Sequence, residues 1–273
     1  MTTDISEKNK IIVLQTEFEE LKTEVEKLRT ELAMLVLERD DFLYQECKNI
    51  EMAYMLSVGA LEYKAHEIEC AVLRLKRKAE LIQAKKNRQE KVILADIEAA
   101  LDVEYAEYKV KLEEQIARMN AALDRSKGTM LTEEETREMK KLYRTIIKNL
   151  HPDLHPELGD TELDLFHNAV FAYEHGDLER LRIINLMVSE PAMPDPGSDK
   201  LSFMAKEKER LIILLDSVKD DIEKIKSEYP YTMKTLVQSP AQIEARKAEL
   251  EEDIKRLDVA LAAYASRIEE LLR

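Results

Sequence analysis

The sequence has no tryptophan and, among 273 residues, only five glycines, seven prolines and two cysteines. Glutamate, lysine, leucine and alanine are abundant instead, and apolar residues recur every three or four positions almost throughout. This combination predicts a nearly all-helical protein with long helices, and no segment has a convincing strand pattern. No apolar run approaches the roughly 20 residues that span a bilayer, and the start, MTTDISEKNK, lacks a signal-peptide core. We therefore expect a cytoplasmic protein without a membrane span.

The two cysteines, Cys47 and Cys70, have neither the spacing of metal ligands nor that of a redox motif. They lie symmetrically about Val58 and Gly59, so an antiparallel hairpin turning there would bring them close. Reduced structural thiols are the favoured interpretation, because disulfides are rare in the cytosol.

Lysine and arginine number 42 against 56 acidic residues, for a net charge of −14. This balance argues against general affinity for nucleic acid or anionic membranes. One basic island is an exception: Arg74, Lys76, Arg77, Lys78, Lys85, Lys86, Arg88 and Lys91. It could bind an acidic protein, a nucleic acid or a lipid headgroup. We favour a solvated helix face that balances glutamates on a neighbouring helix, because no aromatic residues interleave with the charges.

The first 40 residues carry a heptad seam, in which apolar residues alternate by three and four over nearly four repeats. Its members are Ile11, Leu14, Phe18, Leu21, Val25, Leu28, Leu32 and Leu35. In a parallel dimer Glu17 would meet Lys22 of the partner, and Glu24 would meet Arg29, whereas a symmetric antiparallel pair would oppose glutamates. The seam thus predicts a parallel homodimer through Ile11–Leu35. An antiparallel pairing with the next helix of the same chain is the alternative.

Beyond Phe42 the pattern loosens, and Gly59 favours a bend or turn near residues 57–60. A second long helix is expected from Leu61 to Leu123, so that residues 5–125 form a helical rod. Residues 190–199 carry prolines and a glycine and predict a linker. Two further helical patterns in residues 200–273 predict a C-terminal helical hairpin.

Between the rod and the linker, residues 130–189 predict a compact helical module. Thr132 is a good N-cap for a helix that should end at His151, because Pro152 disfavours helical geometry at the residue before it. One face of this helix is apolar: Met139, Tyr143, Ile146 and Leu150. The roughly opposite face is basic, with Arg137, Lys141, Arg144 and Lys148.

A second helix of the module should begin near Thr161, a plausible N-cap. Its apolar stripe, which can close against that of the first helix, contains Leu163, Phe166, Val170 and Tyr173. Histidines and aspartates in this region are too irregularly spaced for a recognisable metal site, so neither a metal nor another cofactor is expected. No phosphate loop, nucleophile elbow or paired-carboxylate signature suggests that the chain is itself an enzyme.

Residues 132–175, about a sixth of the chain, resemble the J-domain family of co-chaperones, which stimulate ATP hydrolysis by heat-shock-seventy chaperones. Residues 139–144, MKKLYR, stand where the second helix of the family reads IKKAYR. His151-Pro152-Asp153 stands at the signature loop, and Phe166, Ala172 and Tyr173 reproduce the F-x5-A-Y spacing of the third helix.

The resemblance implies that the His151-Pro152-Asp153 loop is required to activate a partner ATPase, with the chain as activator. A positive surface of Arg137, Lys140, Lys141, Arg144 and Lys148 would steer the module onto an acidic patch. Asp153 would pair with a partner arginine, and His151, at a helix C-terminus, would carry positive charge or bond loose carbonyls.

Two features of the family are missing. The usual first-helix motif is absent between Asp124 and Glu133, and we expect the end of the preceding helix, through Ile116, Met119 and Leu123, to pack in its place. The glycine/phenylalanine-rich segment and the zinc-binding repeats are also absent, so a general substrate-holding member is not expected.

The predicted architecture is all-α, with long coiled-coil helices flanking a small J-domain-like helical hairpin and followed by the C-terminal hairpin. The predicted function is that of a co-chaperone or adaptor whose long helices bind a client or scaffold protein. The alternative is a structural coiled-coil scaffold in which the hairpin is only a packing module.

Overall fold

The computed structural model describes residues 2–127, 131–188 and 200–273, with side chains from Glu17 onward except that of Lys200. All of its regular structure is helical and these residues contain no strand, which confirms the all-α prediction. The elements are α1 (Thr2–Asp41), η1 (Phe42–Glu46), α2 (Cys47–Tyr54), η2 (Met55–Gly59), α3 (Ala60–Asn87), α4 (Leu94–Glu104), α5 (Ala106–Lys127), α6 (Glu133–Leu150), α7 (Asp160–His175), α8 (Leu178–Met187), α9 (Lys200–Ser227), η3 (Tyr231–Met233), α10 (Lys234–Val237) and α11 (Pro240–Leu272).

The chain divides into two units, each built from segments far apart in the sequence. Unit 1 contains Met1–Lys48 and Thr129–Tyr231, and unit 2 contains Asn49–Gly128 and Thr232–Arg273. The rod expected over residues 5–125 is therefore split between the units. α9 belongs to unit 1 and α11 to unit 2, so the C-terminal hairpin predicted for residues 200–273 is not a unit of its own.

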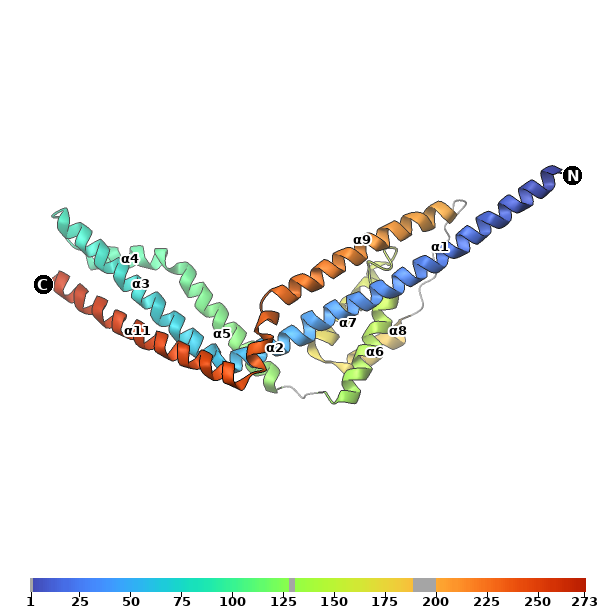
Figure 1. Ribbon diagram of the computed structural model, residues 1–273. Helices are drawn as coiled ribbons and strands as arrows, with labels where there is room; N and C mark the ends of the chain where they lie inside the picture. The colour runs from blue at the N-terminus through green and yellow to red at the C-terminus, as the bar shows by residue number, and fades with distance from the viewer. Residues whose placement is uncertain (1, 128–130, 189–199) are drawn as a thin grey trace. The chain divides into compact units, whose positions relative to one another are not determined.

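In unit 1, α1 and α9 lie side by side (Figure 1). Ion pairs join Glu24 to Lys208, at 2.9 Å, and Glu31 to Lys219, at 3.3 Å, so residue numbers rise together and the helices are parallel. Such exposed pairs are worth little, about 0–1 kcal/mol each. Buried apolar residues supply most of the stabilisation, among them Val25 and Leu32 of α1 and, on α9, Leu211, Leu215, Val218 and Ile222.

This pairing changes the interpretation of the heptad seam. From Phe18 to Leu35 the seam residues belong to the core of unit 1, so this part of the surface predicted for a homodimer is already covered. Two of the seam charges do form ion pairs across parallel helices, but the partner helix is α9 of the same chain. Glu24 pairs with Lys208, and Arg29 pairs with Glu207. The antiparallel alternative with the next helix is wrong, and the side chains of Ile11 and Leu14 lie outside the described residues.

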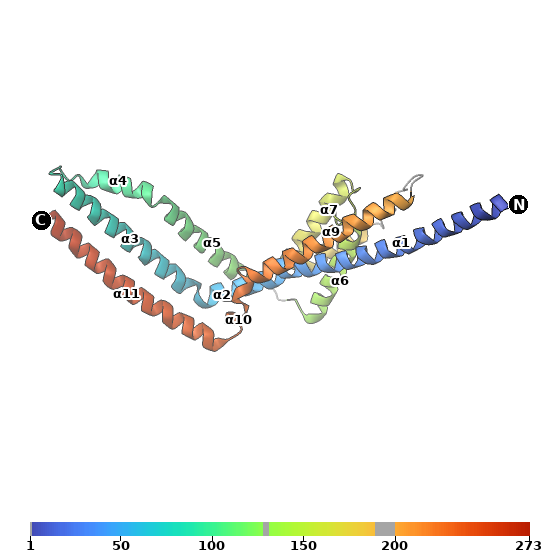
Figure 2. The same cartoon turned by 45° about the horizontal axis from the view of Figure 1, so that its top comes forward.

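In unit 2, α3 packs along α11, and the chain after α3 folds back through α4 and α5 (Figure 2). The two cores of this unit join Tyr54, Val58 and Leu250 at one end of the pair and Ile82 and Leu271 at the other. Residue numbers again rise together, so α3 and α11 are parallel.

The turn expected near residues 57–60 is absent, because the helix continues through η2 into α3. Gly59 lies in a closely packed site instead: an added Cβ would lie 3.2 Å from Met55 Sδ and 3.6 Å from Met119 Cγ. The reversal occurs further on, at Arg88–Ile93, where Gln89 has a φ of 56°. The predicted continuous helix from Leu61 to Leu123 is therefore wrong, since Ile97 and Leu101 become buried only when α4 folds back on α3.

The reversal also explains the basic island. Arg74 pairs with Glu98 and Asp102, at 2.7 and 2.6 Å, and Arg77 pairs with Glu104 at 2.9 Å. Lys78 also pairs with Glu98. For Arg74, Arg77 and Lys78 these contacts agree with the favoured interpretation, in which the island balances acids of a neighbouring helix. Cys47 and Cys70 are both buried and are not joined to each other by a disulfide.

Candidate functional site

The segment containing His151-Pro152-Asp153 joins α6 to α7 in unit 1, and α8 packs on both helices. A capping box starts α6, in which the Thr132 hydroxyl accepts from Glu135 N–H and the Glu135 carboxylate accepts from Thr132 N–H. The helix ends at His151, whose φ and ψ are −71° and 127°, as the following proline predicts. The N-cap of α7 is Gly159 rather than Thr161, so this helix begins two residues earlier than predicted for that cap.

The predicted core of this module is largely confirmed. Met139, Tyr143, Ile146, Leu150, Phe166 and Tyr173 are buried, and Val170 is half-buried against them. Sequence reasoning missed Ile147, Leu154 and Ala169, which are buried too. Leu154 lies in the loop between α6 and α7 and anchors it in the core.

The helix that supports α6 and α7 is α1 rather than the end of the preceding helix. Leu32, Ala33 and Val36 of α1 share a core with the module. By contrast, Ile116 and Leu123 are exposed, and Met119 packs in a core of unit 2. The expectation for these three residues was wrong because sequence proximity does not decide which apolar stripe a helix meets.

A polar cluster fixes α1 to the module. The Tyr143 and Tyr173 rings stack with centroids 4.0 Å apart. The Tyr143 hydroxyl donates to Asp40 Oδ2 at 2.8 Å, and the Tyr173 hydroxyl donates to Asp41 Oδ1 at 2.9 Å. Burial, together with the nearby aspartates, raises the pKa of both phenols, which keeps them as protonated donors.

Lys140, predicted to belong to the partner-binding surface, takes part in this cluster. Its ammonium lies 2.7 Å from Asp41 Oδ2, so it faces α1. The remaining predicted cations of α6 are Arg137, Lys141, Arg144 and Lys148, and all four are exposed. Arg137 pairs with Glu133 within the helix, while the other three have no acidic partner among the described residues. We call Arg137, Lys141, Arg144 and Lys148 the basic face.

His151 is a core residue rather than a free cation. It is only 4% exposed, and its ring meets that of Phe166 edge-on with centroids 5.0 Å apart. Burial lowers its pKa despite the nearby Asp153 carboxylate, so the neutral form is favoured. Nδ1 accepts the Asp153 N–H at 3.1 Å, which places the ring proton on Nε2 and holds the turn of the loop. The expectation of a positive charge at His151 is therefore wrong.

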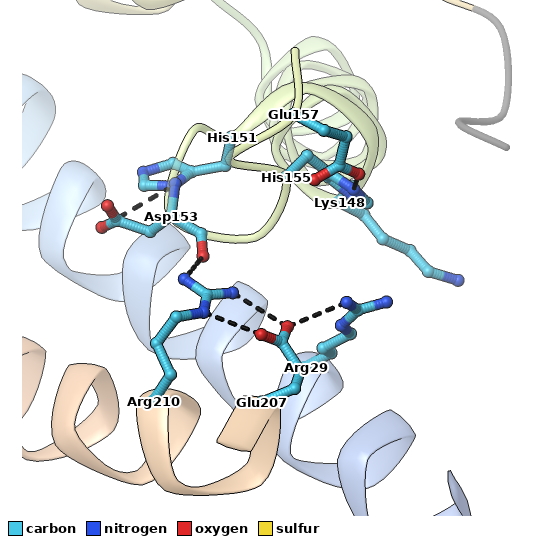
Figure 3. A network of polar contacts seen from close by, with 8 residues as sticks. All are labelled: Arg29, Lys148, His151, Asp153, His155, Glu157, Glu207 and Arg210. Carbon is cyan, nitrogen blue, oxygen red and sulfur yellow. Dashed lines mark hydrogen bonds and ion pairs between the residues drawn. The ribbon is translucent and has the colours of Figure 1, made fainter. Parts of the chain in front are cut away.

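The role of bonding a loose carbonyl at the end of α6 belongs to His155. Its Nε2 donates to the Lys148 carbonyl oxygen at 2.8 Å, and its Nδ1 lies 3.3 Å from Glu157 Oε1 (Figure 3). The sequence pattern pointed to no role for His155, which is one of the histidines too irregularly spaced for a recognisable metal site. Among the described residues, no group of three or more histidine, cysteine or acidic side chains could hold a metal ion.

Asp153 is held from two sides (Figure 3). Its carboxylate, 40% exposed, lies 3.9 Å from His151 Nδ1. Its backbone carbonyl accepts a hydrogen bond of 2.7 Å from Arg210 of α9. The Arg210 guanidinium also pairs with Glu207, at 2.8 Å, and Glu207 in turn pairs with Arg29 of α1 at 2.8 Å. Nothing in the sequence pattern links residues 57 positions apart, so this contact was not predicted.

Across the described residues, no helix has a stretch long and apolar enough to cross a bilayer. Comparison of the chain with models of known protein families, with curated proteins and with solved structures gave no match.

Proposed function

We propose that this protein is a J-domain-type co-chaperone, which recruits a heat-shock-seventy chaperone and stimulates its ATPase. The observation that carries the proposal is the His151-Pro152-Asp153 loop between two packed helices, next to the basic face. Within the described residues, Arg137 is the one member of this face that forms an ion pair. The protein would act as an activator in the cytoplasm and would itself catalyse no reaction.

The charges support an acidic docking partner. Lys141, Arg144 and Lys148 project from α6 and form no ion pair within the described part of the chain, although the chain as a whole carries a net charge of −14. Such a local positive surface accelerates encounter with a negative patch and disfavours other orientations. Binding should therefore weaken as the salt concentration rises.

The loop supplies the second element of recognition. The Asp153 carboxylate is open enough for a partner arginine to take it as a charge-assisted pair. His151 contributes by positioning, since its Nδ1 fixes the Asp153 N–H and thereby the direction of the carboxylate. Pro152 ends α6 at this point and keeps the loop from extending the helix.

The two parallel helix pairs, α1 with α9 and α3 with α11, would bind a client or scaffold protein. Their outer faces carry isolated apolar residues such as Ile213 and Val259, both largely exposed. The protein would then join a client to the chaperone without the segments that general substrate-holding members use.

The test is single-turnover ATP hydrolysis by the heat-shock-seventy chaperones of the source organism. The wild type should accelerate hydrolysis, and Asp153→Asn and His151→Gln should abolish the acceleration. Asp216→Asn is the matched control, because Asp216 is an exposed aspartate on α9 that is remote from the loop in sequence and has no ion pair within the described residues. Absence of acceleration by the wild type with every paralogue would refute the proposal.

A second pair of variants in the same assay tests the role of the basic face. Lys141→Glu should raise the concentration needed for half-maximal acceleration, with a loss that shrinks at high salt. Lys76→Glu is its control, since Lys76 is also exposed but lies on α3 in unit 2. Equal effects of the two variants would mean that only net charge matters.

A structural scaffold is the second candidate. It is favoured by the burial of His151 and by the bond from Arg210 to the Asp153 carbonyl, because both tie the loop to its own chain. In that case Asp153→Asn would leave every interaction intact, while Leu21→Glu or Leu257→Glu would disrupt assembly.

A further inference from the structure

The loop that would dock a partner is already in contact with an arginine of its own chain. Arg210 of α9 donates to the Asp153 carbonyl oxygen at 2.7 Å and contributes a favourable electrostatic interaction with the loop acids Asp153 and Glu157 (Figure 3). An arginine is also the group that a partner would use to recognise the Asp153 carboxylate. Arg210 and the arginine of a partner would therefore both interact with Asp153, Arg210 at the backbone carbonyl and the partner at the carboxylate.

A buried ionic network holds Arg210 in place. Glu207, only 8% exposed, lies between Arg210 and Arg29 and accepts hydrogen bonds from both. Burial alone would raise the pKa of Glu207, but the hydrogen bonds from the two arginines outweigh it and lower the pKa. Glu207 is therefore a carboxylate at neutral pH, and Arg210 is preorganised on α9 while α9 is packed on α1.

The network has an asymmetry that permits Arg210 to release the loop. Glu207 keeps its bond to Arg29, at 2.8 Å, if Arg210 turns away from Asp153. The Arg210–Glu207 pair joins positions i and i+3 of one helix, so it too can persist with a rearranged side chain. Release then removes one charge-assisted hydrogen bond and leaves no buried carboxylate unpaired.

We propose that α9 gates the His151-Pro152-Asp153 loop, with Arg210 as the contact that a docking chaperone must displace. This proposal rests on the proposed function. A partner cation that approaches the Asp153 carboxylate meets the positive charge of Arg210, and the two guanidinium groups repel each other. The closed form is thus a lower-activity state, and a ligand that turns Arg210 away from the loop activates the protein.

The test compares Arg210→Met with Lys219→Met in the full chain. Both variants remove a cation from α9, but Lys219 pairs with Glu31 of α1 and has no bond to the loop. Arg210→Met should lower the concentration for half-maximal acceleration of chaperone ATP turnover by at least about fivefold, the low end of typical coupling between sites. Lys219→Met should match the wild type, and the double variant Arg210→Met/Asp153→Asn should be inactive.

Amide hydrogen exchange of residues 151–159, measured without any chaperone, tests the gate separately. Exchange in this loop should be faster in Arg210→Met than in Lys219→Met, with equal helix content. Unchanged loop exchange, or half-maximal acceleration at an equal or higher concentration than the wild type, would overturn the gate and leave the proposed function standing. If wild type and Arg210→Met both fail to accelerate any chaperone, the proposed function falls, and the gate falls with it whatever the exchange shows.

Discussion

Tyr143→Phe is the sharpest test of how unit 1 is held together. The change removes one hydroxyl and keeps the ring, so the stacking on Tyr173 is preserved. What is lost is the hydrogen bond to Asp40 Oδ2, a carboxylate oxygen of a residue that is only 1% exposed. Arg39 remains on the other oxygen of Asp40, Oδ1.

The expected loss of unfolding free energy in Tyr143→Phe follows from this geometry. A hydrogen bond to a charged group contributes about 1.5–3 kcal/mol, and water cannot replace it at a buried carboxylate, so we expect a loss of about 2–3 kcal/mol. Tyr173→Phe should cost less, about 1 kcal/mol, because Asp41 is 31% exposed and keeps its pair with Lys140. In the Asp40→Asn background, where the acceptor is neutral, the cost of Tyr143→Phe should fall by at least about 1 kcal/mol.

Native-state hydrogen exchange of the α6 amides measures these values, since it reports the unfolding free energy of unit 1 without assuming that both units unfold together. Three results would refute the reasoning: a cost of Tyr143→Phe below about 0.5 kcal/mol, which is typical of surface changes; an equal or larger cost for Tyr173→Phe; or an unchanged cost in the Asp40→Asn background.

Two further predictions concern the α1 seam and pH. Leu32→Ala should destabilise unit 1 by about 2–5 kcal/mol because its side chain is fully buried, whereas Met34→Ala, at a residue that is 52% exposed, should change stability by less than about 0.5 kcal/mol in the same exchange measurement; similar costs would mean that the seam does not pack in the core of unit 1. For pH, burial lowers the pKa of His151 below its ordinary 6.5, so the unfolded chain takes up this proton first. The contribution of neutral His151 is complete above pH 6.5 and declines as the pH falls from there towards the folded pKa; urea unfolding at several pH values should show this decline in the wild type and less of it in His151→Gln.

Much of the module was predictable because its signals are local. Thr132 and Glu135 form a capping box within one helical turn, and Pro152 acts on the residue directly before it. The apolar stripe of Met139, Tyr143 and Ile146 follows from helical periodicity, which brings these residues to one face whatever lies opposite.

The sequence by itself therefore determined that the chain is helical, where α6 begins and ends, and which of its faces is buried. Only the tertiary structure decided which helices pack together, because an apolar stripe can pack against any complementary stripe and does not specify one. Leu32 packs in the core of unit 1, and Arg210 contacts the Asp153 loop across 57 residues. Burial then changed the chemistry: the neutral form of His151 is favoured in a core, whereas its position at a helix end had suggested either a positive charge or a bond to loose carbonyls.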